Sequence, residues 1–444
     1  MPCLFLILTF SFNAAAEKST TALSSVTVTA TRSEKNKTDV AASIDTKYKD
    51  EIQMNSPALQ SELLNSIAGV RITQTGSTIG HMTSIKMPIS TGPYYLMLQD
   101  GIPVQSSGFF NHNGLAYTNS STAGSVEVLK GAGTALYGSD AVAATINVMS
   151  KSITEENSLA IKTEAGSDGF LRLGGEFSKN INDKSDFAGE FSHGQSDGWR
   201  DHTAYKRDEI TVKHIYDHDD TSTFKTILTA NQSDAEMAGS VIGLDALNND
   251  STSVGNIQFA LDRGLDIKRK FDFARLSTEW AHDISNTVDM NTILYLRSNR
   301  NRYTATWEKN LPHNDGQQKT LGLMFKTNIR RGKAGFSMGF DAEYTQANTL
   351  YTQLFDYIPS GYGSAVVKGT IYDYDVDYFA GAPYLRTEYQ LTEKLQIGAG
   401  IRYDSNSYDY TNNIGDGQYA NSSYSRAADN NDPTFTHLRG IATV

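Results

Sequence analysis

Hydrophobic and polar residues alternate along the chain from Ser158 onward, with the period of two that is typical of β-strands. The alternation is clearest in the segments 288–297, 336–344 and 395–404. One face of each segment is apolar, and the other carries charged residues, which include Asp289, Arg297, Asp341, Glu343, Arg402 and Asp404. Such strands predict an antiparallel sheet that separates an apolar environment from a polar one. A soluble β-sandwich would bury the apolar face instead, and the alternation alone leaves both architectures open.

The connections between these strands are alternately short and long. Short connections are expected at 181–184, 217–221, 283–286, 330–333 and 391–394, and long ones at 196–206, 233–268, 299–317, 347–373 and 405–433. Outer-membrane barrels have short periplasmic turns and long extracellular loops, so this order favours a transmembrane β-barrel. About eleven strands precede Val444, whereas plugged barrels have about 22. We therefore expect only the first half of a barrel, from a truncated frame or a fragment.

The first third of the chain predicts a compact α+β unit. Ser56 can cap a helix that starts at Pro57 and ends at Gly69. The helix would pack on one stripe, made of Leu59, Leu63, Leu64 and Ile67. Strands are predicted at 70–73, 95–99, 126–129 and 145–149, with loops rich in Gly, Ser and Asn at 75–80 and 106–121. Loops on a rigid scaffold are where binding groups usually lie.

Residues 126–151 carry the most informative pattern, VEVLKGAGTALYGSDAVAATINVMSK. A strand is predicted at each end of this segment. Between the strands, Gly131 and Gly133 permit a turn that a Cβ would hinder, and residues 134–137 allow one helical turn. Gly138 can then take the left-handed conformation that ends this turn. The lysine and hydroxyl residue of a phosphate-binding loop do not follow, so a structural turn explains the glycines.

This segment resembles the end of the plug domain in the TonB-dependent receptors, which typically reads IEVLKGPxSALYGxxAxGGxINVxTK. Two upstream segments extend the resemblance: residues 64–70 match L-x-x-x-P-G-V and residues 98–104 match L-x-D-G-x-P. The chain departs from the family pattern at Ala132, Ala143 and Ala144, and residues 85–88 replace an Ile-Arg-Gly run. The motif residues expected to shape the plug are Asp100, Gly101, Gly131, Gly133, Tyr137 and Gly138. Three matches in the family's order rarely arise by chance.

The resemblance implies a transmembrane β-barrel of the type with about 22 strands, with an N-terminal α+β plug domain in its lumen. The plug would span residues 33–151 and the barrel residues 152–444, after a periplasmic segment at 17–32. The β-branched run at 26–32 stands where the family has its TonB box, which pairs with TonB by strand addition. The residues expected to pair are Val26, Thr27, Val28, Thr29 and Ala30. An ordinary first strand of the plug sheet is the alternative.

The N-terminus has the features of an export signal. An apolar run at 4–12 is followed by small residues, which predicts a signal peptide at 1–16 that is cleaved after Ala16. A buried N-terminal strand is the alternative. Cys3 is the only cysteine, so the mature chain would contain no thiol or disulfide. No segment approaches the roughly 18 apolar residues of a transmembrane helix.

Charge and motif content exclude several functions. The chain has 39 basic and 50 acidic residues and a net charge of -11, which disfavours nucleic acid as a partner. The mean hydropathy of -0.41 suits a barrel with a polar lumen as well as a soluble protein. The sequence contains no H-E-x-x-H, no G-x-S-x-G and no clustered Cys and His. We therefore predict no catalytic residue, no metal site, no cofactor and no enzymatic activity.

The family resemblance implies active transport across the bacterial outer membrane, most often of a ferric siderophore or similar iron chelate. TonB and its inner-membrane energising complex would supply the energy, and lipid would surround the multi-pass barrel. Haem, cobalamin and oligosaccharide are alternative substrates, and a passive porin or an adhesin is an alternative class.

Ligand contacts are expected in outward-facing plug loops, at Tyr94, Tyr95, Phe109, Phe110, Asn111, His112 and Asn113. Aromatic rings and amides offer apolar faces and hydrogen bonds to an organic chelate. The aromatic residues among them could equally pack the plug against the barrel wall. His81 and His112 could ligate haem iron or simply form hydrogen bonds. Five loop tyrosines either join the ligand site or stabilise a long loop, namely Tyr351, Tyr357, Tyr362, Tyr372 and Tyr374.

Overall fold

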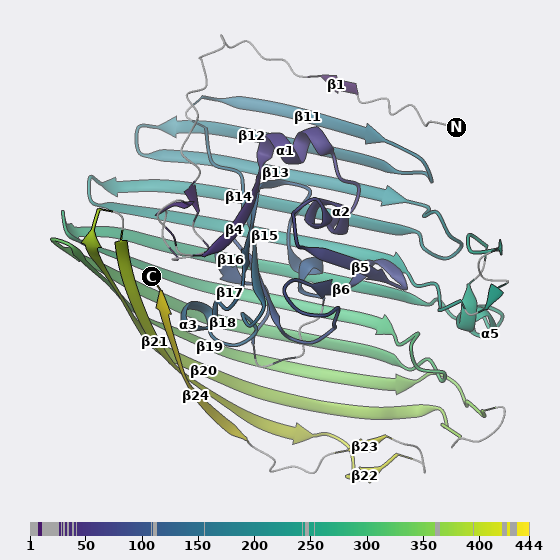
Figure 1. The fold of residues 1–444 in the computed structure, drawn as a ribbon. Helices are drawn as coiled ribbons and strands as arrows, with labels where there is room; N and C mark the ends of the chain where they lie inside the picture. The colour runs from purple at the N-terminus through teal and green to yellow at the C-terminus, as the bar shows by residue number, and fades with distance from the viewer. Residues whose placement is uncertain are drawn as a thin grey trace.

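The computed structural model describes most of the chain from residue 26 onward. The described residues are 8–10, 26–27, 29, 32, 35–37, 40, 42–107, 109, 113–154, 156–241, 243–244, 248–252, 254–359, 365–393, 395–419, 424–426 and 433–443. Two units are visible: a large curved sheet and a smaller α+β unit against its concave face (Figure 1).

The large sheet has thirteen strands in the order β1-β11-β12-β13-β14-β15-β16-β17-β18-β19-β20-β21-β24. Their bounds are β1 (Leu8–Phe10), β11 (Ser158–Ala165), β12 (Leu171–Asn182), β13 (Ser185–Ser196), β14 (Tyr205–Asp219), β15 (Ser222–Glu236), β16 (Lys268–Ser285), β17 (Val288–Thr304), β18 (His313–Arg331), β19 (Ala334–Gln353), β20 (Gly369–Thr392), β21 (Leu395–Asn412) and β24 (Thr434–Thr443). Neighbouring strands are antiparallel throughout. Among the described strands, β24 pairs only with β21, so the sheet forms an open wall rather than a closed cylinder.

The predicted short connections are all confirmed. Four are two-residue turns, at 183–184, 220–221, 286–287 and 332–333, and the fifth separates β20, which ends at Thr392, from β21, which begins at Leu395. The long connections are shorter than expected, at 197–204, 237–267, 305–312, 354–368 and 413–433, because the strands extend several residues further at that end. They contain η3 (Gly255–Ile257), α5 (Gln258–Leu261), β22 (Gly417–Gln418) and β23 (Ser425–Arg426). The wall therefore has a short-turn end and a long-loop end.

The two faces of the wall differ as the alternation predicts. Leu294 and Leu296 on β17 are 54% and 57% exposed, whereas Arg297 on the opposite face is 3% exposed. Arg297 donates hydrogen bonds to Pro103 and Ser106 of the smaller unit, so the polar face is turned towards that unit. No second sheet covers the apolar face among the described residues, so the β-sandwich alternative is wrong. A broad exposed apolar surface of this kind suits contact with lipid.

The smaller unit contains a five-stranded sheet in the order β4-β9-β10-β7-β8. Its strands are β4 (Ser43–Tyr48), β7 (Tyr95–Gln99), β8 (Ile102–Pro103), β9 (Ala123–Lys130) and β10 (Ala144–Ser150). The remaining elements are α1 (Lys49–Asn55), α2 (Gln60–Asn65), the hairpin of β5 (Arg71–Thr75) and β6 (Ser77–Ser84), η2 (Gly114–Tyr117) and α3 (Thr134–Tyr137). The predicted strand, single helical turn and returning strand around residues 126–149 are confirmed.

Two local predictions for this unit are wrong. Ser56 does not begin a helix: it is the C-cap of α1, with φ of 40°. The next helix starts at Gln60, because the Glu62 carboxylate accepts the backbone N–H of Ala58 at 2.8 Å and of Leu59 at 3.3 Å, which caps the helix there. Residues 77–80, predicted as loop, form the start of β6, where Ser77 pairs with Thr75 of β5 and a register shift follows.

The core of the smaller unit joins it to the wall. Apolar side chains of the five-stranded sheet and of α2 form one cluster with Tyr205, Phe271 and Phe273 of the wall. Tyr117 of η2 packs edge-on against Phe271, with ring centroids 5.3 Å apart. Within the described part of the chain, every helix is too short or too polar to span a bilayer.

Candidate functional site

Described residues of the predicted TonB box lie against the sheet of the smaller unit. β2 (Val26–Thr27) pairs with β3 (Lys35–Asn36), and Val28 and Ala30 lie outside the described residues. The Thr27 hydroxyl and the Thr29 backbone N–H both donate to Glu127 Oε2, at 2.9 and 2.8 Å. Glu127 lies on β9 and is 2% exposed. A buried carboxylate therefore holds the segment, since hydrogen bonds to charged groups contribute about 1.5–3 kcal/mol each.

Thr29 is also held from its other side. Tyr137 donates its phenol proton to the Thr29 carbonyl at 2.9 Å, and Asn147 Nδ2 donates to Thr29 Oγ1 at 3.1 Å. Burial raises the pKa of the Tyr137 phenol, so this group stays protonated and remains a donor. Tyr137 and Asn147 come from the segment that carries the family motif. The motif segment thus forms part of the surface on which the box lies.

Arg32 attaches the end of the box segment to the wall. Both terminal nitrogens of its guanidinium bind the Asp341 carboxylate of β19, each at 2.9 Å. The guanidinium lies 4.6 Å from the Tyr137 ring centre and 5.3 Å from that of Tyr384. Lys326 donates to the Arg32 carbonyl. The backbone φ of Arg32 is 54°, a conformation that non-glycine residues hold only when their surroundings fix it.

The box segment contacts the wall close to its short-turn end. Lys326, Asp341 and Glu388, which pairs with Lys35, all lie in the half of their strands nearest the short turns. The two sequence predictions, of a periplasmic box and of periplasmic short turns, are therefore consistent with each other.

The motif glycines allow close approach of backbone to neighbours. Gly138 has φ of 80°, and a Cβ there would lie 2.8 Å from Asp404 Oδ1 of the wall. Gly131 has φ of 125°, which side chains rarely permit. A Cβ on Gly133 would lie 3.0 Å from Thr145 Oγ1. The turn of residues 131–138 therefore packs tightly against both the plug sheet and the wall.

Asp100 and Gly101 form the two-residue turn of the β7–β8 hairpin, both with positive φ. Asp100 Oδ1 accepts the Ser150 backbone N–H at 2.8 Å and the Ser150 hydroxyl at 2.7 Å. Burial alone would raise the pKa of Asp100, but Lys213, Arg275 and the Ser150 hydrogen bonds together bring this pKa below its usual value. The ionised side chain thus ties the hairpin to the end of β10 and to the wall.

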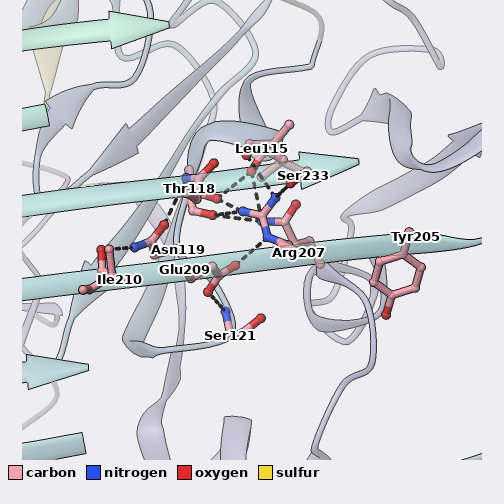
Figure 2. Close-up of polar contacts among 12 residues, drawn as sticks. Leu115, Thr118, Asn119, Ser121, Tyr205, Arg207, Glu209, Ile210 and Ser233 are labelled. Carbon is pink, nitrogen blue, oxygen red and sulfur yellow. Dashed lines mark hydrogen bonds and ion pairs between the residues drawn. The ribbon is translucent and has the colours of Figure 1, made fainter. Parts of the chain in front are cut away.

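A further cluster fixes the middle of the smaller unit to the wall (Figure 2). Arg207 on β14 donates to the Thr118 carbonyl at 2.6 Å and pairs with Glu209 at 2.6 Å. Glu209 in turn accepts the Ser121 backbone N–H at 2.9 Å. Asn119 Nδ2 reaches a β14 carbonyl, that of Ile210, at 2.9 Å. Three plug residues, Thr118, Asn119 and Ser121, are thus bound to one wall strand.

The predicted ligand contacts separate into different environments. Tyr95 is 3% exposed in the plug core and its hydroxyl accepts the Ile85 N–H at 3.2 Å, so its ring offers no surface to a ligand. Asn113 is also buried, and its Oδ1 accepts the His81 backbone N–H at 3.1 Å. Tyr94 is 36% exposed, and Phe109 packs edge-on to Tyr378 of β20 at 5.6 Å. The remaining three, Phe110, Asn111 and His112, lie outside the described residues.

Two further sequence expectations concern histidine and the loop tyrosines. His81 lies on β6 and is 3% exposed, which leaves no room for haem at this side chain. Tyr351 and Tyr372 stack at 5.8 Å, and Tyr351 donates to Glu308 at 2.6 Å. These tyrosines, with Tyr357, pack in one apolar cluster between the long loops, so they stabilise the loops. Tyr374 packs against Tyr410, and Tyr362 lies outside the described residues.

Sequence reasoning missed the residues that bind the box and fix the plug. Glu127 appears in the sequence only as a polar position in an alternating strand, although two long-range hydrogen bonds converge on it. The sequence indicates Arg32 only as the last residue of the predicted TonB box and gives no sign of its contact with the wall. The inward charges of the wall strands were the one available signal for Asp341 and Arg402. No group of three or more His, Cys, Asp or Glu able to hold a metal occurs among the described residues.

Comparisons with known proteins match this arrangement. Residues 36–145 match the family model "TonB-dependent Receptor Plug Domain". The vitamin B12 transporter BtuB of Vibrio vulnificus strain CMCP6 is 34% identical over 146 residues, which are 32% of this chain and 23% of that protein. Two solved structures share the fold. The unliganded ferric citrate transporter FecA has a TM-score of 0.73 at 16% identity, over 90% of this chain and 60% of its own.

The ferric yersiniabactin receptor FyuA of Yersinia pestis has a TM-score of 0.69 at 15% identity, over 90% of this chain and 61% of its own. The chain thus spans less than two thirds of the length of these relatives. The fold is that of a plugged barrel, here with an unclosed wall. The family in question comprises transporters and receptors rather than enzymes. Residues 36–145 are therefore a plug domain of the TonB-dependent receptors, and the described chain has the fold of the transporter FecA and the receptor FyuA.

Proposed function

We propose that this protein carries out TonB-dependent active transport of a ferric siderophore or similar iron chelate across the bacterial outer membrane. The observation that carries the proposal is the segment around Thr27 and Thr29, bound to buried Glu127 and tied to the wall by Arg32. The segment is held by side-chain hydrogen bonds and an ion pair, which it can exchange for pairing with a partner by strand addition. A passive porin has no use for such a segment.

The energy for transport would come from the partner. Ligand bound above the plug would favour release of residues 26–32, TonB would pair with this segment, and a weakly held part of the plug would then yield. Opening part of a domain costs less free energy than unfolding all of it. In this scheme the wall contacts of Arg207 and Asn119 keep the middle of the plug in place.

The apolar outer face of the wall supports a place in the outer membrane, with lipid around it and the short turns on the periplasmic side. We propose a plug at 33–151, barrel strands from 152 onward and a periplasmic segment at 17–32. Residues 8–10 of the predicted signal peptide at 1–16 pair with β11 as β1 at the edge of the wall, and the rest of it lies outside the described residues. The signal peptide and its cleavage after Ala16 stay a prediction, and an N-terminal strand stays the alternative.

The substrate proposal rests on the long-loop end of the plug. Phe109 lies beside Tyr378, in the half of β20 nearest the long loops, and Tyr94 is partly exposed. We retain Tyr94, Phe109, Phe110, Asn111 and His112 as proposed ligand contacts. Cobalamin is a second candidate, because the relative with 34% identity is named a vitamin B12 transporter.

The test is uptake of labelled ferric siderophores, haem and cobalamin by cells with and without the full-length gene, in strains with and without TonB. We expect gene-dependent uptake of a ferric chelate that disappears without TonB. Uptake of cobalamin alone would select the second candidate. Uptake that persists without TonB would contradict active transport.

A further inference from the structure

Arg269, near the long-loop end of β16, is a buried cation without a counter-charge. Its side chain is fully enclosed, with 1% of the residue exposed. Its Nε and Nη2 atoms have no hydrogen-bond partner among the described residues. No carboxylate in the described part of the chain forms an ion pair with it. Burying an unpaired charge is costly because the ion loses its hydration.

The other buried arginines of the wall each have a counter-charge, although Nε and Nη2 of Arg275 also lack a hydrogen-bond partner among the residues that the structure describes. Each has a carboxylate within 3.5 Å: Arg207 pairs with Glu209, Arg275 with Asp100, Arg297 with Glu343, and Arg402 with Asp341. These four arginines all contact the plug, so pairing is the rule for a cation at this interface. Arg269 departs from that rule at the end of the wall where a ligand would arrive.

Aromatic rings surround the Arg269 guanidinium. Its central carbon lies 4.8 Å from the ring centre of Tyr303 and 5.7 Å from those of Phe271 and Trp307. Ring faces attract a cation but do not replace hydrogen-bond acceptors in the plane of the guanidinium. Phe271 is fully buried, whereas Trp307 is 58% exposed. Trp307, in the connection 305–312, is therefore the side of the cage that faces solvent.

The plug side of the cage supplies no negative charge. A Cβ on Gly80 would lie 2.9 Å from Arg269 Nη1, so the β5–β6 hairpin lies directly against the guanidinium. Burial, together with the Arg269 charge, lowers the pKa of the adjacent His81 to about 4, which keeps this imidazole neutral near pH 7. The described plug residues therefore provide no carboxylate to neutralise Arg269, and at Gly80 the plug lies too close to the guanidinium for a larger side chain.

We propose that Arg269, covered by Trp307, is a recognition site for a carboxylate group of the transported chelate. The Trp307 ring would move aside, and the carboxylate would accept hydrogen bonds from the free guanidinium nitrogens in its plane. The inference rests on the proposed transport function and refines it: the substrate is an anionic, carboxylate-bearing chelate rather than a neutral ligand such as cobalamin. Because Gly80 lies against the same guanidinium, a carboxylate that binds Arg269 would also change the contact between the wall and the β5–β6 hairpin of the plug.

The binding test uses the full-length receptor in detergent with Trp199, Trp280 and any tryptophan outside residues 1–444 replaced by Phe, so that the fluorescence comes from Trp307. Ferric citrate is the carboxylate probe, and ferrichrome, a neutral ferric chelate, and cyanocobalamin are the neutral probes. We expect ferric citrate to change Trp307 fluorescence on binding, and Arg269→Gln to weaken binding by about tenfold or more. Arg300→Gln is the control, because Arg300 is a cation at the same end already paired with Asp315 at 2.6 Å.

The inference is overturned if ferric citrate fails to bind, or if it binds Arg269→Gln as tightly as the parent protein. Binding and uptake of a neutral probe only would overturn the carboxylate site and leave the transport proposal standing. Absence of TonB-dependent uptake for every chelate would instead overturn the proposed function.

A second measurement tests the missing counter-charge without any ligand. Arg269→Met should raise the unfolding temperature of the unliganded receptor, because it removes an unpaired buried cation. Arg297→Met should lower that temperature, because it leaves Glu343 without its cation. A lower unfolding temperature for Arg269→Met would show that the guanidinium has a partner in the unliganded receptor and would contradict the inference.

Discussion

Glu127→Gln should release the box segment while keeping the shape of its binding surface. In the parent protein, one carboxylate oxygen accepts both the Thr27 hydroxyl and the Thr29 backbone N–H, at 2.9 and 2.8 Å. The glutamine carbonyl can accept the same two hydrogen bonds but carries no charge. The substitution therefore tests the charge of Glu127 separately from the packing around it.

The size of the effect follows from the strength of the two bonds. A hydrogen bond to a charged group contributes about 1.5–3 kcal/mol and a neutral one about 0.5–1.5 kcal/mol, so each bond loses about 1–1.5 kcal/mol. Two bonds together lose about 2–3 kcal/mol. Because about 1.4 kcal/mol is tenfold, the equilibrium between bound and released segment shifts by roughly 30- to 140-fold. The apparent affinity for a partner that needs the released segment rises with the released fraction, up to the point where release is complete.

The assay is surface plasmon resonance of the periplasmic domain of TonB on the full-length, unliganded receptor. We expect tighter TonB binding to Glu127→Gln than to the parent, and a smaller further gain when ligand is added. Asp45→Asn is the control, because Asp45 lies on the neighbouring strand β4, is paired with Lys130 and does not touch the box. Equal TonB affinity for the parent and Glu127→Gln would show that the charge of Glu127 does not hold the box segment.

Three more predictions concern the plug and its contacts. Arg32→Ala and Asp341→Asn should each strengthen TonB binding to the unliganded receptor, and the double variant should add little, since both remove the same paired contact; additive gains would contradict this. Gly138→Ala should destabilise the receptor by about 1–3 kcal/mol, because φ is 80° and the new Cβ would lie 2.8 Å from Asp404 Oδ1; an unchanged thermal unfolding curve would argue against the tight packing. The pKa of Asp100 is lower in the folded protein than its unfolded value of 3.8. Its ionised form therefore stabilises the plug at pH values above 3.8, and this stability is lost as the pH falls through the pKa of the folded state. Proteolysis of the plug between about pH 5 and pH 3 should accelerate in the parent and depend less on pH in Asp100→Asn, which lacks the titrating group.

The regular parts of the fold could be predicted from the sequence because each depends on a local pattern. The alternation at 288–297, 336–344 and 395–404 fixes which face of the wall meets the plug, and strand pairing keeps that assignment over the whole strand. Gly131 and Gly138 mark a turn that requires positive φ, and the structure has it there. The helix start at Gln60 was missed because the Glu62 cap competes with the signal at Ser56 and Pro57, and sequence alone does not rank the two.

The site contacts depend on pairs of residues distant in the chain, and these have no local signature. Thr27 and Glu127 are 100 residues apart, and Arg32 and Asp341 are 309 apart. Tyr95 illustrates the reverse error: its aromatic ring suggests a ligand contact, but its position in a strand with every residue buried places it in the core. The contacts between plug and wall are determined by the curvature of the sheet around the plug, which the sequence alone does not give.

We infer that the segment ending at Arg32 couples this receptor to TonB. Deleting residues 24–32 from the full-length receptor tests it most directly, with ligand binding and cellular uptake measured side by side. We expect binding to the cell surface to stay at the parental level while uptake is lost. Parental uptake by the deleted receptor would contradict this inference.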